Sequence, residues 1–268
     1  VVPPEASPEA TYYENIIVQR LEGGVVLLRI NRPERRNALN QATLTELAHA
    51  ARTFDRDEAV GCLVITGDER AFAAGADVTE MDGKGVPEML GAYRFESWEA
   101  LTRTRKPMVA AVSGFALGGG LELALLCDMI VLSESAQLGQ PEINLGLIPG
   151  AGGTQRLTRQ LGKYLAMEVI LAGRMLTADE ALAHGLANRV APTGEYLDAA
   201  LELARNVAAR APHAVTLAKS AVNRAQDGPL AHGLEFERNA FFLLFGTADQ
   251  KEGIRAFLGK RRPDFTGT

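Results

Sequence analysis

The stretch Gly114-Phe115-Ala116-Leu117-Gly118-Gly119-Gly120-Leu121-Glu122 decides how the rest of the chain is organised. It lies within residues 108–127, where Glu122 is the only charged side chain, and residues 135–155 likewise contain a single charge, Glu142. Burying a carboxylate among apolar groups is costly unless the carboxylate is paired or used. The two glutamates, each surrounded by apolar residues and glycines, therefore predict a pair of carboxylates in a site that excludes water.

The glycines before Glu122 predict a helix that starts at Gly118 or Gly119. The first N–H groups of a helix have no partner inside the helix, and the helix dipole adds positive potential in front of them. Such donors can form an oxyanion hole, which stabilises negative charge on a carbonyl oxygen by roughly 3 kcal/mol per donor in favourable cases. Residues 74–76 are candidates for a second donor, and Glu122 and Glu142 can then divide the roles of base and acid.

Each of these features also has a simpler interpretation. Glu122 taken alone is equally consistent with a buried glutamate paired with an arginine, although a second isolated glutamate beside glycines weakens that interpretation. The arginines of the loop 31–40 lie either in a solvated surface loop or against an anionic ligand. Trp98 is expected in the core, and an acyl pocket is its second interpretation.

Composition excludes several classes of protein. The 268 residues, 47% of them hydrophobic, suffice for one large domain or a core with an appendage. The net charge of −5 is spread along the chain without a basic stripe, so nucleic acid is not an expected partner. Residues 108–127 approach membrane-spanning length, but four glycines, Ser113 and Glu122 interrupt them, so no membrane partner is expected. We expect a cytoplasmic protein, and because the chain does not begin with Met, a removed organellar leader stays open.

Other kinds of site find no support in the sequence. The four histidines have no ligand spacing, so no metal site is expected. The run 150–153 is not a dinucleotide fingerprint, because Gln155 stands where the last glycine is required. There is no phosphate loop and no nucleophile elbow. Cys62 and Cys127 lie in apolar runs and are expected to be small buried hydrophobic residues. No cofactor is therefore expected.

Strands and helices are expected to alternate along most of the chain. Strands are expected at residues 16–19, 24–30, 60–66, 108–112 and 128–132, and helices after the cap Asn40 and over residues 86–105. This alternation predicts an α/β fold with mostly parallel pairing up to about residue 190. Residues 196–258 are almost entirely helical in pattern and predict a separate helical appendage.

Three runs of the chain resemble the crotonase family, and within it the enoyl-CoA hydratases. The resemblance rests on Ala71-Phe72-Ala73-Ala74-Gly75-Ala76-Asp77, on Ala116-Leu117-Gly118-Gly119-Gly120-Leu121-Glu122-Leu123-Ala124, and on Gly139-Gln140-Pro141-Glu142-Ile143 with Pro149-Gly150-Ala151-Gly152-Gly153-Thr154-Gln155-Arg156. It extends to Asn31-Arg32-Pro33 and to Asp249-Gln250-Lys251-Glu252-Gly253, and so covers nearly the whole chain.

The resemblance implies a fold and an assembly. The fold class is α/β, a crotonase-like spiral of ββα repeats with a C-terminal helical oligomerisation region. Residues 1–195 would form the spiral, acyl-CoA-binding catalytic core, and residues 196–268 the helical trimerisation region. The expected assembly is a homotrimer, or a hexamer built as a dimer of trimers.

The resemblance also implies a reaction, the reversible hydration of trans-2-enoyl-CoA thioesters to 3-hydroxyacyl-CoA. The N–H groups of Ala76 and Gly119 match the oxyanion hole that holds the thioester carbonyl. Glu122 matches the glutamate that activates water, and Glu142 matches the one that exchanges the proton at the carbon next to the thioester. CoA is part of the substrate rather than a cofactor.

Further residues are expected to contact the substrate. Ala74, Asp77, Gly118 and Gly150 are the candidates near the acyl thioester; Arg32, Arg35, Arg70 and, from a neighbouring subunit, Lys260 or Arg261 are the candidates for the CoA phosphates.

Two other functions stay open at the level of sequence. An enoyl-CoA isomerase of the same family is the runner-up, although the presence of both glutamates favours hydration. A non-catalytic acyl-CoA-binding homologue is the third possibility, and the intact run 118–120 argues against it. The preferred acyl chain and the pathway, whether the β-oxidation of fatty acids or the breakdown of aromatic or branched acids, are not given by the sequence.

Overall fold

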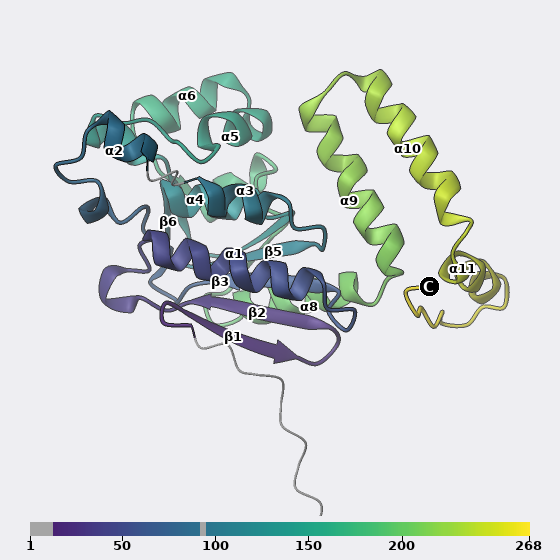
Figure 1. The fold of residues 1–268 in the computed structure, drawn as a ribbon. Helices are drawn as coiled ribbons and strands as arrows, with labels where there is room; N and C mark the ends of the chain where they lie inside the picture. Colours follow the sequence, from purple (N-terminus) through teal and green to yellow (C-terminus); the bar gives the residue numbers. More distant parts are fainter. Residues whose placement is uncertain (1–12, 92–94) are drawn as a thin grey trace, which may run out of the picture.

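The structure is a computed structural model, and it describes residues 13–91 and 95–268 (Figure 1). A six-stranded sheet has the order β1-β2-β3-β5-β7-β10. Its strands are β1 (Ile16–Leu21), β2 (Val25–Ile30), β3 (Cys62–Thr66), β5 (Met108–Val112), β7 (Met129–Ser133) and β10 (Arg189–Ala191). Only β1 and β2 pair in antiparallel fashion, as the predicted hairpin, and the other neighbours in this sheet are parallel.

A second, four-stranded sheet explains how the chain winds. Its order is β4-β6-β8-β9, from β4 (Ala71–Ala73), β6 (Phe115–Leu117), β8 (Gln137–Gly139) and β9 (Leu176–Thr177). Along the chain β3 is followed by β4, β5 by β6 and β7 by β8, so each turn contributes one strand to each sheet before its helices. This is the predicted spiral of ββα units, and the predicted fold class is confirmed.

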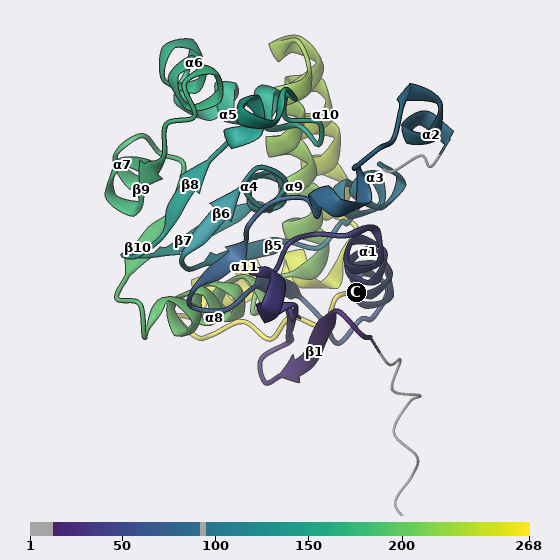
Figure 2. The same cartoon turned by 90° about the vertical axis from the view of Figure 1, so that its left-hand side faces the viewer.

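The helices of the core surround these sheets. One face of the six-stranded sheet is covered by the main core, and α8 covers the opposite face (Figure 2). The core helices are α1 (Gln41–Asp55), α2 (Val86–Gly91), α3 (Glu96–Thr102), α4 (Gly119–Leu126), α5 (Gly153–Leu161), α6 (Lys163–Leu171), α7 (Ala178–Ala183) and α8 (Tyr196–Ala208). The 3-10 helices are η1 (Pro33–Arg35), η2 (Val78–Glu80) and η3 (Pro141–Leu145). Asn40 caps α1 as predicted, because its side chain accepts a hydrogen bond of 2.8 Å from the N–H of Thr43.

The six-stranded sheet is buried on both faces. Side chains alternate along a strand, so Leu63 and Ile65 of β3 enter the main core while Val64 faces α8. Small residues of α8, such as Ala204, allow the helix to lie close to the strands. This two-sided burial is why the strands are continuous apolar runs in the sequence.

The last three helices extend beside the core (Figure 1). They are α9 (Pro212–Asp227), α10 (Leu230–Leu244), which packs against α9, and α11 (Ala248–Leu258). The predicted division at residue 196 places α8 with this helical region, whereas α8 itself packs on the core sheet. The assignment of residues 196–268 to trimerisation stays a prediction.

One expectation about local structure was wrong, and one group of strands was not foreseen. The helix expected over residues 86–105 is instead α2 and α3, with residues 92–94 outside the described part of the chain. The strands of the second sheet were not foreseen, because strands of two or three residues are too short to show an alternating pattern. Within residues 13–91 and 95–268, the helices are too short or too polar to cross a membrane.

Candidate active site

A cavity of about 320 Å³ lies where the second sheet meets α4. Its walls come from the start of α1, the loop after β4, helices α2 and α3, the start of α4, and the segment from η3 to α5. The apolar part of the wall includes Leu44, Met81, Met89, Trp98 and Leu147. Among the described residues, the polar side chains on the wall are Gln41, Glu122 and Glu142. The cavity can therefore hold an apolar chain with two carboxylates beside it.

Two backbone N–H groups meet at this cavity. A Cβ atom built on Gly119, the first residue of α4, would lie 3.4 Å from the backbone nitrogen of Ala76. The parallel bridge between Leu39 and Ala76 uses the N–H of Asp77 and the carbonyl of Gly75, so the N–H of Ala76 is directed away from Leu39. Within the described part of the chain, the N–H groups of Ala76 and Gly119 have no recorded acceptor. The pair fits the predicted oxyanion hole.

Gly118 brings the second carboxylate close to these donors. Its φ angle is 49°, and a Cβ atom at this position would lie 2.9 Å from Oε1 of Glu142. Only glycine satisfies both conditions without strain. The glycine run thus serves two purposes, since it starts α4 and makes room for Glu142.

Glu122 is held by backbone groups rather than by a side chain. Only 3% of its surface is exposed, and its Oε1 accepts hydrogen bonds of 2.7 Å from the N–H groups of both Ala151 and Gly153. Burial raises the pKa of Glu122 above its ordinary value, while the two N–H groups and the charge of Arg156 oppose that rise. Among the described residues no arginine forms a salt bridge with Glu122, and the charge of Arg156 acts on it without direct contact, so the interpretation as a glutamate paired with an arginine holds only in this weaker form.

Glu142 lies in η3 and is half-buried. Burial and the negative charge of Glu122 raise the pKa of Glu142 to about 7. The side-chain amide of Gln140, which is fully buried, can donate hydrogen bonds of 2.9 and 3.1 Å to the two Glu142 oxygens. Gln140 was not foreseen, although a polar residue two positions before Glu142 in an apolar run was a usable signal.

The remaining predicted residues divide into two groups. Ala74, Gly118 and Gly150 line the cavity. Asp77 does not, because its carboxylate pairs with Arg32 at 3.0 Å and accepts a hydrogen bond from the hydroxyl of Thr79. This pair fixes the loop that carries the Ala76 N–H.

The cations predicted to hold the CoA phosphates lie away from the cavity wall. Arg32 is paired with Asp77 and donates to the carbonyl of Ala38, so its guanidinium is already engaged. Arg35 is exposed at the end of η1, and Lys260 is exposed just after α11. Arg261 pairs with Glu252.

Arg70 is also exposed, at the start of β4, whereas Ala74 follows the other end of that strand. The contacts of all these cations with CoA stay predictions.

Three further predictions concern buried side chains. Trp98 is 9% exposed and packs in the core, as predicted; it also lines the cavity, and its use in an acyl pocket stays a prediction. Cys62 and Cys127 are buried as predicted, and burial raises the pKa of Cys62 to about 12. Gln41 was not foreseen: its Oε1 is buried without a donor among the described residues.

An arrangement of two N–H donors and two carboxylates around an apolar cavity is typical of an enzyme site. Comparisons with known proteins identify the family. Residues 20–268 match the family model described as enoyl-CoA hydratase/isomerase. The chain belongs to this family, the crotonase family, and the predicted enzyme class is confirmed.

Individual relatives are similar over almost their whole length. The chain is 51% identical over 253 residues to a probable enoyl-CoA hydratase of Rhizobium meliloti, covering 94% of this chain and 98% of the relative. It is 47% identical over 252 residues to the 2,3-dehydroadipyl-CoA hydratase of Escherichia coli, with the same coverage. A crystal structure of an enoyl-CoA hydratase subunit from Geobacillus kaustophilus superposes with a TM-score of 0.92 at 45% identity, covering 96% of this chain and 99% of that one.

Proposed function

We propose that the chain catalyses the reversible hydration of trans-2-enoyl-CoA thioesters to 3-hydroxyacyl-CoA. The observation that carries this proposal is the convergence of the Ala76 and Gly119 N–H groups with Glu122 and Glu142 on one cavity. Relatives at 51% and 47% identity are named hydratases of CoA thioesters, which supports the same substrate class. The apolar wall suits the acyl chain of such a substrate.

The proposed mechanism uses the two carboxylates in opposite protonation states. The N–H groups of Ala76 and Gly119 bind the thioester oxygen and draw electrons from the double bond. Ionised Glu122 takes a proton from water as the water oxygen bonds to C3, and the electron pair of the double bond moves toward the thioester as an enolate. Protonated Glu142 then gives its proton to C2, which completes the addition of water. The pKa of about 7 for Glu142 supports its role as the acid.

The test compares the wild type with Glu122→Gln and Glu142→Gln on crotonyl-CoA. Both variants keep the shape of the carboxylate but lose its base or acid function, so each is expected to lose about 10²- to 10⁴-fold in kcat while still binding CoA ligands. The measurement is the loss of absorbance of the conjugated thioester, with the product mass determined in parallel. A wild type that leaves the mass unchanged but moves the double bond of a 3-enoyl-CoA is an isomerase. One that binds acyl-CoA without turnover is the non-catalytic homologue.

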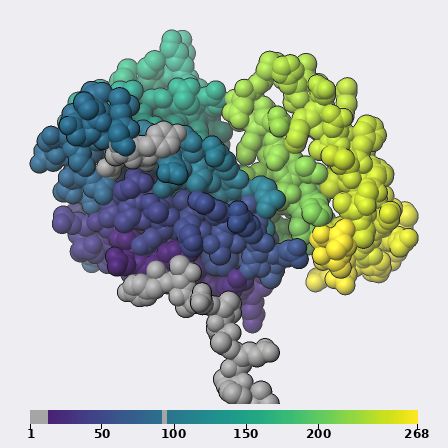
Figure 3. All heavy atoms as spheres, viewed as in Figure 1, coloured from purple at the N-terminus to yellow at the C-terminus, as the bar shows by residue number. Residues whose placement is uncertain are grey.

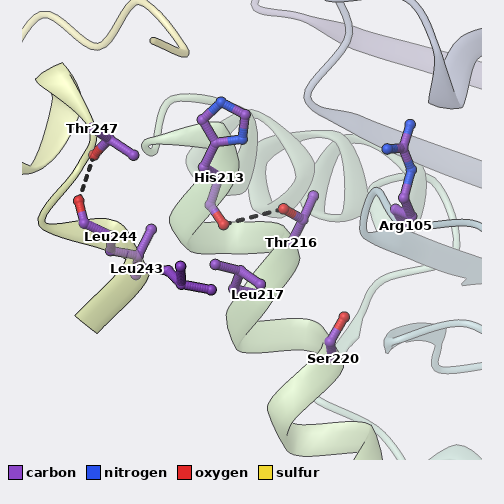
Figure 4. A pocket seen from close by; sticks show the side chains of 8 residues that line it. All are labelled: Arg105, His213, Thr216, Leu217, Ser220, Leu243, Leu244 and Thr247. Atoms are coloured by element: carbon purple, nitrogen blue, oxygen red, sulfur yellow. Dashed lines mark hydrogen bonds between the residues drawn. The ribbon is translucent and has the colours of Figure 1, made fainter. Parts of the chain in front are cut away.

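We also propose that the chain forms a homotrimer, or a hexamer made of two trimers, through its C-terminal helices. In Figure 3 these helices form an arm beside the core. Large apolar side chains are exposed on α10 and α11: Phe241, Phe242, Leu243, Phe257 and Leu258, each more than half exposed. A cavity of about 440 Å³ also lies between α9, the end of α10 and Arg105 (Figure 4). Exposed apolar groups on neighbouring helices are typical of an interaction surface.

The cytoplasmic location of the protein stays a prediction.

A further inference from the structure

The segment 151–153 determines where the Glu122 carboxylate lies. Both hydrogen bonds to Oε1 of Glu122 come from this segment, from the N–H groups of Ala151 and Gly153. Gly153 is also the first residue of α5. Because the two donors are separated by a single residue, a small rotation of the intervening peptides would misdirect one of them. The shape of the segment is therefore as important for Glu122 as the donors themselves.

Arg156 contacts this segment directly. Its Nη1 donates a hydrogen bond of 2.8 Å to the carbonyl of Ala151. A Cβ atom on Gly152 would lie only 2.1 Å from the same Nη1, so the guanidinium packs directly against this glycine. Gly152 has a φ of 109°, and its carbonyl accepts the backbone N–H of Arg156 at 2.8 Å. The N–H groups of the segment thus bind Glu122. The carbonyls of Ala151 and Gly152 bind Arg156, whose guanidinium also packs against Gly152.

The guanidinium also sets the electrostatic environment of Glu122. Glu122 faces the positive charge of Arg156 from α5, and its own charge is felt by Glu142 in η3. Arg156 in turn faces Asp227, at the end of α9, and the thiol of Cys127. Burial lowers the pKa of Arg156, but a guanidinium stays charged in a protein. The charge lowers the pKa of Glu122 against the effect of burial.

We propose that Arg156 is a positioning residue of the site: its guanidinium fixes the segment 151–153, and through that segment it fixes Glu122 as the base. The inference rests on the proposed function, in which Glu122 takes the proton from water. It adds a charge that favours the ionised form of Glu122, beside the two backbone N–H groups that do the same. Arg156 does not touch the substrate in this role, because it acts through Ala151, Gly152 and its own charge.

The test uses three variants on the full chain with crotonyl-CoA. Arg156→Met removes both the charge and the hydrogen bond, Arg156→Lys keeps the charge but loses the planar fork, and Arg159→Met is the matched control. Arg159 lies on the same helix, and its partners among the described residues are the carbonyls of Gln226 and Gln155 and the Gln155 side chain. Its replacement by Met removes one positive charge, as Arg156→Met does, without touching the segment 151–153.

The expected results separate positioning from general support of the fold. Arg156→Met should lower kcat about 10²-fold with KM within about 3-fold, and should move the acid limb of kcat/KM to higher pH, because Glu122 is then harder to ionise. Arg156→Lys should lower kcat by a smaller factor and leave the acid limb in place. Arg159→Met should resemble the wild type in both respects.

A double variant decides whether Arg156 acts through Glu122. In a Glu122→Gln background, Arg156→Met should lower the rate by less than about 3-fold, because its target has been removed. A full additional loss, an unmoved acid limb in Arg156→Met, or equal effects of Arg156→Met and Arg159→Met would overturn the inference. If Arg156→Met does not fold by circular dichroism, Arg156→Lys decides, and an unchanged kcat in it overturns the inference. By contrast, a wild type without hydration of crotonyl-CoA would contradict the proposed function itself.

Discussion

Two glutamates of one cavity, Glu122 and Glu142, differ in their neighbours, and the proposed mechanism uses this difference to assign the base and the acid. Glu122 accepts two backbone hydrogen bonds and faces the charge of Arg156, so its ionised form is supported even though it is buried. Glu142 has the negative charge of Glu122 beside it, which together with burial favours its protonated form. Environments that push two carboxylates apart in pKa are the usual way in which one site contains both a base and an acid.

A pH profile tests this assignment. The pKa of Glu142 is raised from its ordinary 4.5 to about 7, so its proton is present below pH 7 and is lost above it. Because the proposed reaction needs this proton, kcat/KM for hydration of crotonyl-CoA should fall by about tenfold per pH unit once the pH is well above 7. Steady-state rates from about pH 5 to about pH 9 provide the measurement. A rate that stays constant up to pH 9 contradicts the role of Glu142 as the acid.

The raised pKa of Glu142 also makes the stability of the folded chain depend on pH. The folded chain binds this proton more tightly than the unfolded chain, so ionisation of Glu142 reduces the free energy of unfolding as the pH rises from about 4.5 to about 7. Glu142→Gln cannot ionise at this position, and it should lose less stability than the wild type over that interval.

Single residues could be predicted from sequence where the signal was local. Glu122 and Glu142 stand out because each is the only charge in a long apolar stretch. Arg156 was within a recognised run but had no assignable role, because its contact with Ala151 depends on the turn at Gly152. Pairs such as Arg32 with Asp77 join distant parts of the chain, and one sequence contains no signal for them.

At the scale of helices and strands, the long elements with a clear local pattern could be predicted from the sequence, and the short strands could not. The β1–β2 hairpin, α1 with its Asn40 cap and the start of α4 at Gly119 were correctly predicted, because each has several consecutive residues of one periodicity or a cap. The second sheet was missed, although it positions Ala76 and Glu142 just after β4 and β8. The register of such short strands is determined by long-range packing rather than by their own residues.

Lys219 attaches α9 to the core through a buried ion pair with Asp128 and a hydrogen bond to the carbonyl of Lys106. Nζ of Lys219 lies 2.8 Å from Oδ2 of Asp128, with the two side chains only 10% and 16% exposed. Lys219→Met leaves Asp128 without its cation, which should lower the free energy of unfolding by about 3 kcal/mol. Urea denaturation of the wild type and the variant at the same protein concentration measures this difference in the free energy of unfolding. Glu202→Gln, which breaks the exposed pair of Glu202 with Arg189 at 3.9 Å, is the control and should cost less than about 1 kcal/mol. Equal costs for the two variants contradict the attachment.

At the scale of the whole molecule, the C-terminal helices expose large apolar side chains that packing within a single chain does not explain. A single chain gains little hydrophobic stabilisation from Phe242 of α10 and Phe257 of α11, which are 67% and 83% exposed. A face of this kind is stable in water when another copy covers it, and closed symmetric assemblies are the common result. The sequence pattern showed the helices, but the family resemblance was needed to suggest what they do.

Sedimentation velocity tests whether these exposed side chains of α10 and α11 hold the proposed assembly together. The wild type should sediment as a trimer or a larger species, and the double variant Phe242→Glu with Phe257→Glu should sediment as a monomer, because two buried charges without partners oppose association. Leu90→Glu is the matched control, since Leu90 is 74% exposed on α2, in a different part of the chain. If the wild type is a monomer, or if the double variant assembles as the control does, α10 and α11 do not form the contact between copies.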